Sequence, residues 1–141
     1  MKQVEKKKVR QPRGLMIMSA LGQFKADLVL KNANVLNVFT GEFMPRDVAI
    51  NGDTIIGIGE YEGTYEYDLS GMYIVPGFID AHVHIESSML TPQIFTREVL
   101  KRGTTTLIAD PHEIANVCGE DGLKYMLDAA AECPVNLYYM M

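Results

Sequence analysis

Residues 76–88 read PGFIDAHVHIESS, and this stretch constrains the fold more than any other part of the chain. A Pro-Gly turn leads into a short run in which two histidines stand one residue apart. Because successive side chains of a β-strand point to opposite faces, residues two apart share a face. One predicted face carries mostly polar side chains, namely Phe78, Asp80, His82, His84 and Glu86. The other face is apolar and carries Ile79, Ala81, Val83 and Ile85.

The histidine pair predicts a metal site. Two residues along a strand span roughly 6.6 Å, at about 3.3 Å per residue, so the imidazoles of His82 and His84 can lean onto one ion. The simpler interpretation is two buried histidines bonded to main-chain carbonyls, but a pair on one face at a strand end favours metal. A bound divalent ion lowers the pKa of water from about 15.7 to about 7, which yields a nucleophile at neutral pH.

A family resemblance rests on these residues. PGFIDAHVHIE resembles the first barrel strand of the metal-dependent amidohydrolase superfamily, whose hallmark is a His-x-His pair ending that strand. The segments HIESSM and ADPHEIANVCG narrow the resemblance to the bacterial type of adenine deaminase, from about Ala26 onward. The resemblance implies an α/β fold, the N-terminal part of a metal-dependent (β/α)₈ TIM-like barrel preceded by a small β-sandwich-like domain. With 141 residues the barrel is expected to be incomplete in this chain, because such barrels typically need about 250.

The same resemblance implies an activity. It is hydrolytic deamination of adenine to hypoxanthine and ammonia, a purine-salvage reaction, by a metal-activated hydroxide. The implied cofactor is a divalent metal in a binuclear site, for which manganese, iron and zinc all suit the ligand types. His82 and His84 would be metal ligands, and later ligands would lie beyond residue 141, so the fragment itself is expected to be inactive.

Two alternatives remain open. One is another cyclic amidohydrolase of the dihydroorotase or hydantoinase kind, which would share PGFIDAHVH but not ADPHEIAN. The other is a catalytically silent truncated fragment that packs against a partner or itself.

A second cluster of ionisable residues comprises Asp110, His112 and Glu113, at the end of and just after the predicted strand TTTLIAD. As a plain helix start, Asp110 would be the cap, Pro111 the first helical residue and Glu113 a favourable charge near the dipole. The cluster also stands at the C-terminal end of a predicted barrel strand, where such barrels build their active sites. We therefore predict catalytic roles for all three residues, leaving open purine contact, proton transfer or an extra metal position.

Glu86, Ser87 and Ser88 are predicted substrate-binding residues. Glu86 shares the ligand face of the strand, although a carboxylate in a loop can simply face solvent. The two serines begin a loop, where small polar residues also serve ordinary turn chemistry.

Two motifs of other metal-dependent enzyme families are only partly matched by this sequence. His112-Glu113 begins like a zinc-protease HExxH, but Asn116 stands where the second histidine must be. His84-Ile85-Glu86 matches the H-x-E of the cytidine-deaminase type, which also needs Pro-Cys-x-x-Cys, and this chain has only Cys133-Pro134 there. A deaminase must therefore use the barrel-type mechanism.

Three regions follow from the pattern. Residues 1–25 are predicted to form a basic arm and a short helix, 26–75 the N-terminal half of a small antiparallel β-domain, and 76–141 the first βα units of the truncated barrel. Asn51-Gly52 predicts a hairpin turn. In the barrel region we expect a helix from Thr91 to Gly103, a strand TTTLIAD, a loop PHEIANVCGE, a helix from Asp121 to Ala131 and a strand VNLYYMM.

Composition limits the partners. The net charge is −5, yet residues 1–13 hold six basic residues against one acidic, so the body is acidic and does not favour nucleic acid. No apolar stretch reaches the roughly 18 residues of a membrane span. Cys118 and Cys133 form no CxxC pattern and no secretory signal precedes them, which indicates reduced thiols in a cytoplasmic protein. The expected partner is a small purine base, and the full-length enzyme is expected to be a homo-oligomer.

Overall fold

The structure is a computed structural model that describes residues 2–3 and 12–140. Most of the predicted basic arm lies outside the described residues. The described chain divides into two compact units, one within residues 12–76 and one within residues 77–140 together with a short N-terminal strand.

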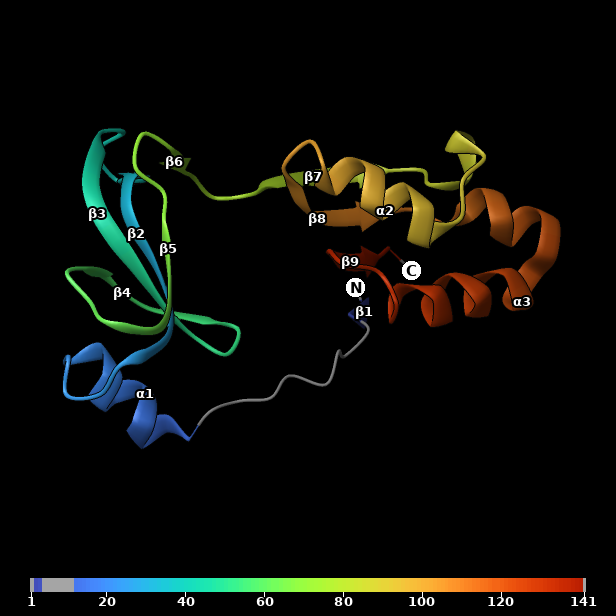
Figure 1. Cartoon of the computed structure of the whole chain (residues 1–141). Helices are drawn as coiled ribbons and strands as arrows, with labels where there is room; N and C mark the ends of the chain where they lie inside the picture. Colours follow the sequence, from blue (N-terminus) through green and yellow to red (C-terminus); the bar gives the residue numbers. More distant parts are fainter. Residues whose placement is uncertain (1, 4–11, 141) are drawn as a thin grey trace. The chain divides into compact units, whose positions relative to one another are not determined.

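The first unit contains one helix and a five-stranded sheet (Figure 1). Its elements are α1 (Arg13–Ala20), β2 (Ala26–Leu36), β3 (Phe43–Asn51), β4 (Thr54–Gly59), β5 (Gly63–Asp68) and β6 (Tyr73–Ile74). The strand order is β4-β3-β2-β5, and β6 also pairs with β2. A second sheet, which a sandwich requires, is not among the described residues of this unit, so the sandwich-like domain stays a prediction.

The direction of two strands differs from the prediction. β3 is antiparallel to β2 and β4 as expected, but β5 and β6 run parallel to β2, so the wholly antiparallel domain is wrong. The cause is the connection after β4. Residues 60–62 lead the chain back to the start of β2, where the Ala26 N–H donates to the Glu62 carbonyl at 2.9 Å. The predicted turn after Asn51 is confirmed, with Gly52 at φ +57°.

A partly buried ion pair stabilises this sheet. The Lys31 ammonium donates to Asp47 Oδ2 at 2.6 Å, and Asp47 also accepts the Asn32 N–H at 3.0 Å and the Tyr61 N–H at 3.4 Å. Burial alone would raise the pKa of Asp47, but the ammonium and the two N–H groups outweigh it and hold the pKa below its usual range.

The second unit alternates strands with helices, as predicted. Its elements are β1 (Lys2–Gln3), β7 (Phe78–Val83), the 3₁₀ turn η1 (Glu86–Ser88), α2 (Pro92–Leu100), β8 (Thr104–Ala109), α3 (His112–Ala130) and β9 (Asn136–Tyr139). The strand order is β1-β9-β8-β7 (Figure 1). β7, β8 and β9 are mutually parallel, while β1 is antiparallel to β9. Parallel strands joined by helices are the arrangement of a (β/α) barrel.

The helix boundaries partly match the sequence pattern. α2 has Thr91 at its N-cap and proline at its first position, and Gly103 follows at φ +89°, as expected. The predicted loop over residues 111–120 is wrong, because α3 begins at His112. Gly119 interrupts α3 with φ +58° and ψ −140°, a conformation open to glycine. The sequence around this glycine resembles a loop because the helix is broken there.

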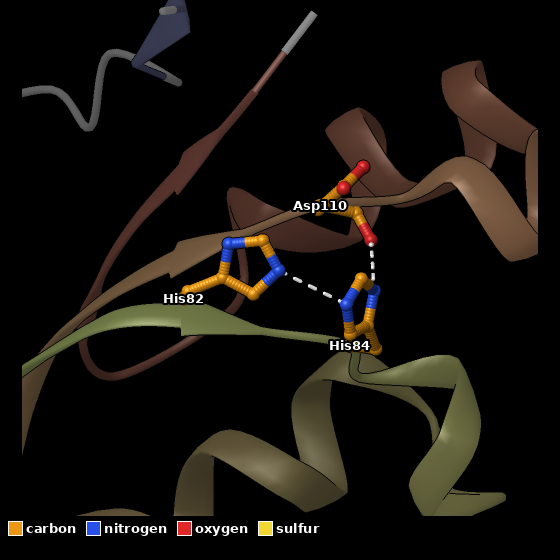
Figure 2. A group of neighbouring side chains, drawn as sticks. All are labelled: His82, His84 and Asp110. Carbon is orange, nitrogen blue, oxygen red and sulfur yellow. Dashed lines mark hydrogen bonds between the residues drawn. The ribbon is translucent and has the colours of Figure 1, made fainter.

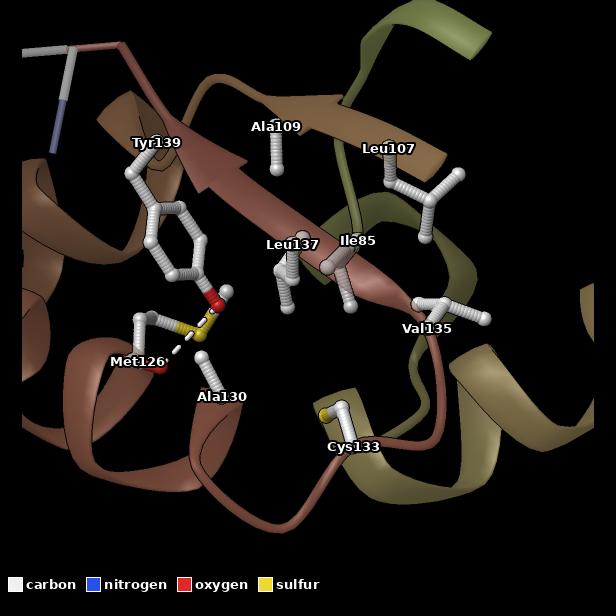
Figure 3. Close-up of a cluster of buried hydrophobic side chains, with 9 residues drawn as sticks. All are labelled: Ile85, Leu107, Ala109, Met126, Ala130, Cys133, Val135, Leu137 and Tyr139. Atoms are coloured by element: carbon white, nitrogen blue, oxygen red, sulfur yellow. Dashed lines mark hydrogen bonds between the residues drawn. The ribbon is translucent and has the colours of Figure 1, made fainter. Parts of the chain in front are cut away.

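The core of this unit lies between the sheet and α3 (Figure 3). Its buried side chains are Ile85, Leu107, Ala109, Met126, Ala130, Cys133, Val135, Leu137 and Tyr139. The Tyr139 hydroxyl donates to the Met126 carbonyl at 3.0 Å, which satisfies its polar end. The expected apolar back of β7 is wrong at Ile79, which is 66% exposed, and at Ala81, whereas Val83 packs against the core. Ile85 is buried, but it lies past the end of β7 and has α-helical angles. β7 is the edge strand, and nothing within the described residues covers the part of it that holds Ile79 and Ala81.

Candidate metal centre

The candidate site lies where β7 and β8 end. Val83 is the last residue of β7 and pairs with Ala109, the last residue of β8. The Asp110 N–H then donates to the Val83 carbonyl at 3.0 Å. Because the strands are parallel and adjacent, the residues that follow them are held side by side at one edge of the sheet.

The imidazoles of His82 and His84 face each other (Figure 2). Their Nε2 atoms are 3.0 Å apart, and the ring planes meet at 69°. Two nitrogens bound to one ion at about 2.0–2.1 Å, with an angle between them of roughly 90–110°, lie about 2.8–3.4 Å apart. The predicted ligand pair therefore has the spacing that a shared ion requires.

A main-chain acceptor orients one of these rings. His84 Nδ1 lies 3.0 Å from the Asp110 carbonyl oxygen, so an Nδ1–H donates to it (Figure 2). The other ring nitrogen, Nε2, then carries the lone pair that a metal ligand needs. Side-chain patterns gave no sign of this carbonyl. Only the adjacency of β7 and β8 places Asp110 beside His84.

Asp110 also contacts His112. Its Oδ2 lies 3.1 Å from His112 Nδ1. Desolvation would raise the pKa of Asp110, but the hydrogen bonds from His112 and its nearby charge outweigh it, so the pKa is lowered. Asp110 is therefore a carboxylate at neutral pH, next to an imidazole with which it can share a proton.

The structure brings the predicted catalytic residues to the histidine pair. Potential ligand atoms of His82, His84 and Asp110 all lie within 4.8 Å of one another. A second group, formed by His84, His112 and Glu113, meets the same limit, and the rings of His84 and His112 have centroids 4.8 Å apart. The two groups share His84.

The three predicted substrate-binding residues are engaged within the protein. The strand pattern ends before Glu86, because Ile85 has α-helical angles and residues 86–88 form η1. Glu86 Oε1 accepts the Ile114 N–H at 3.2 Å, and the Ser87 hydroxyl donates to Glu113 Oε1 at 2.6 Å. The Ser88 hydroxyl donates to the Ile85 carbonyl at 2.6 Å, which is local turn chemistry. Their contact with substrate stays a prediction.

Two pockets have different relations to this site. A pocket of ≈ 460 Å³ lies beside Asp110 and His112, with Pro111 and Met140 in its wall. A larger pocket of ≈ 980 Å³ belongs to the first unit, is lined in part by Lys31 and Asp47, and contains no histidine. Geometry at the histidines, rather than pocket size, therefore identifies the candidate site.

Among the described residues, no helix has the length and apolar character needed to cross a membrane.

Comparisons with known proteins agree with the site. The Amidohydrolase family matches residues 73–141. An adenine deaminase of Clostridium acetobutylicum is 58% identical over 125 residues, which are 89% of this chain and 22% of that protein. Adenine deaminase 2 of Carboxydothermus hydrogenoformans is 56% identical over 126 residues, again 89% of this chain and 22% of that protein. The chain thus spans about a fifth of the length of the curated relatives that it matches.

Solved structures share the fold at low sequence identity. N-acyl-D-glutamate deacylase from Bordetella bronchiseptica, complexed with zinc and a phosphonate inhibitor, is 24% identical with a TM-score of 0.51, over 61% of this chain and 19% of that one. β-Aspartyl dipeptidase from Fervidobacterium islandicum is 20% identical with a TM-score of 0.52, over 82% of this chain and 33% of that one. These likenesses indicate a TIM-barrel-type fold.

The histidine pair, its place at the end of a parallel strand and the matched sequences agree, so residues 73–141 belong to the amidohydrolase family and the chain corresponds to part of the proteins called adenine deaminase.

Proposed function

We propose that the protein hydrolyses adenine to hypoxanthine and ammonia in a metal-dependent reaction. The observation that carries the proposal is the 3.0 Å distance between His82 Nε2 and His84 Nε2 at the C-terminal end of β7. The identity of 50–58% with several adenine deaminases supports adenine as the substrate.

His82 and His84 would hold the metal through their Nε2 atoms. A divalent ion bound there would supply a water molecule acidified to hydroxide near neutral pH. We propose a binuclear site, and the donor atoms of His112 and Glu113, which lie next to the histidine pair, support it. Imidazole and carboxylate donors suit manganese, iron or zinc.

Asp110 and His112 would move protons at this site. The attack adds a water oxygen at C6 of adenine, and the departing amino group must gain a proton to leave as ammonia. Asp110 Oδ2 and His112 Nδ1, 3.1 Å apart, can take the proton released by the water and pass it to that nitrogen. Glu113 would be a third catalytic residue beside this pair. Glu86, Ser87 and Ser88, which the sequence predicts as substrate-binding residues, would form the adjoining part of the site, where Glu86 and Ser87 bond the first turn of α3.

Later segments would complete the site. We propose that residues 76–141 are the first βα units of a (β/α)₈ barrel, which in this chain is incomplete, and that residues 26–75 belong to a sandwich-like domain. The exposed edge of β7 and the position of His82 on it support this view. The fragment alone would then lack ligands and activity. We further propose a cytoplasmic, homo-oligomeric enzyme of purine salvage with no nucleic-acid or membrane partner.

The test is an assay of ammonia release by the complete protein. The metal-depleted protein, and samples reconstituted with Mn²⁺, Fe²⁺ or Zn²⁺, are each given adenine, dihydroorotate or hydantoin. The proposal predicts that adenine is the only one of the three substrates to react, that it yields ammonia and hypoxanthine, and that it does so only after metal is restored. Ring opening of a cyclic amide without ammonia from adenine would instead support the dihydroorotase or hydantoinase type.

A further inference from the structure

Four hydrogen bonds join the last residue of β7 and the segment that follows it to the segment after β8. They run from Asp110 N–H to the Val83 carbonyl, from His84 Nδ1–H to the Asp110 carbonyl, from Ile114 N–H to Glu86 Oε1, and from the Ser87 hydroxyl to Glu113 Oε1. Their lengths are 3.0, 3.0, 3.2 and 2.6 Å. The parallel pairing of the strands thus continues past their ends through side chains.

Glu86 supplies a cap that α3 does not provide for itself. The first N–H groups of a helix have no partner within the helix. Pro111 stands at the N-cap of α3 and offers no side-chain acceptor. The Ile114 N–H instead donates to Glu86, which belongs to η1 and lies 28 positions earlier in the chain.

We infer that Glu86 and Ser87 are positioning residues that fix the first turn of α3, and with it Asp110 and His112, against His84. Ser87 and Glu86 bind neighbouring residues of that turn, Glu113 and Ile114, so together they prevent its rotation and its withdrawal from η1. We call the two hydrogen bonds from Ile114 to Glu86 and from Ser87 to Glu113 the clamp. The catalytic meaning of this inference rests on the proposed function, whereas the existence of the clamp does not.

The second carboxylate oxygen of Glu86 gives a way to distinguish a positioning role of this residue from a role that needs its negative charge. Oε2 is buried and has no hydrogen-bond partner among the described residues, although burying a charged oxygen without one is costly. Glutamine would keep the Oε1 acceptor and remove the buried charge. A positioning role therefore predicts that Glu86→Gln retains what Glu86→Ala loses, whereas a role that needs the charge predicts that both variants fail.

The first test is hydrogen exchange at the Ile114 amide in the complete protein. Removing its acceptor should raise exchange about tenfold in Glu86→Ala, with recovery in Glu86→Gln, and about threefold in Ser87→Ala. Gln93→Ala is the matched control, because it removes another cross-element bond, 3.2 Å to Glu132, beyond the far end of α3. Exchange at Ile114 that is unchanged in both Glu86→Ala and Ser87→Ala would overturn the clamp. Should Glu86→Ala not fold, Ser87→Ala, which removes an exposed bond, decides alone.

The second test is Co²⁺ titration, read from the visible spectrum of the bound ion. Displacing a group that orients a ligand typically weakens metal affinity 10–100-fold, so we expect about a tenfold loss in Glu86→Ala and wild-type affinity in Glu86→Gln. Equal losses in both variants would overturn the positioning role. If the wild-type protein binds no Co²⁺, the proposed function fails, while exchange at Ile114 still tests the clamp.

Discussion

The Nδ1–H of His84 donates to the main-chain carbonyl of Asp110 across 3.0 Å. This contact joins the end of one barrel strand to the end of the next. It sets the tautomer of His84, so that Nε2 faces His82 with its lone pair available. It also separates two functions of Asp110, because the carbonyl orients the histidine while the carboxylate contacts His112.

That separation predicts the behaviour of Asp110→Asn. The substitution keeps the carbonyl, so His84 stays oriented and metal content is retained. Loss of the carboxylate that we propose to accept the proton should lower the rate of ammonia release from adenine by about 10²- to 10⁴-fold. Metal analysis beside steady-state kinetics checks this. Loss of metal along with activity would mean that the carboxylate is itself a ligand.

The Lys31–Asp47 pair predicts a pH dependence of stability in the first unit. The pKa of Asp47 is lowered by folding. Its contribution is therefore fully present above the unfolded-state pKa of about 3.9, and it is lost as pH falls through the lower folded-state pKa. Asp47→Asn should cost about 2–4 kcal/mol at pH 7, because it leaves the partly buried Lys31 without its counter-charge.

Urea unfolding at pH 7 and at pH 2.5 measures this effect. The loss caused by Asp47→Asn should shrink at the lower pH, where the wild-type carboxyl is also becoming protonated. Glu98→Gln is a suitable control, since Glu98 forms an exposed pair with Lys101 in the other unit. An equal loss at both pH values would show that the charge of Asp47 is not the cause.

Gly119 and Gly14 predict opposite effects of the same substitution. Gly119→Ala places a side chain at φ +58° and ψ −140°, so it should destabilise the protein by about 1–3 kcal/mol although alanine favours helices. Gly14 lies in α1 with open space around it and no positive φ, so Gly14→Ala should stabilise by about 0.4–1 kcal/mol. Thermal unfolding compares them. A stabilising Gly119→Ala would mean that α3 is continuous.

The sequence predicted what depends on local pattern. The alternation around His82 and His84 predicted a strand, and Thr91, Pro92 and Gly103 marked the limits of α2. Prediction from sequence failed where neighbouring elements determine the burial or the direction of a strand. Ile79 is exposed because no described helix covers its part of β7, and β5 is parallel to β2 because of the connection that precedes it.

At the site, the sequence named the ionisable residues but not what they contact. Asp110, His112 and Glu113 were visible as a cluster, yet their approach to His84 depends on the pairing of β7 with β8. The hydrogen bond from Ile114 to Glu86 joins residues 28 positions apart and involves a main-chain N–H, which no side-chain pattern reports.

X-ray absorption of the zinc-loaded complete protein tests the central claim most directly, that His82 and His84 bind one ion. The account predicts at least two imidazole nitrogens at about 2.0–2.1 Å from zinc, and their loss in the His82→Ala/His84→Ala double variant. A zinc environment that is unchanged in the double variant, or that contains oxygen ligands alone, would contradict it.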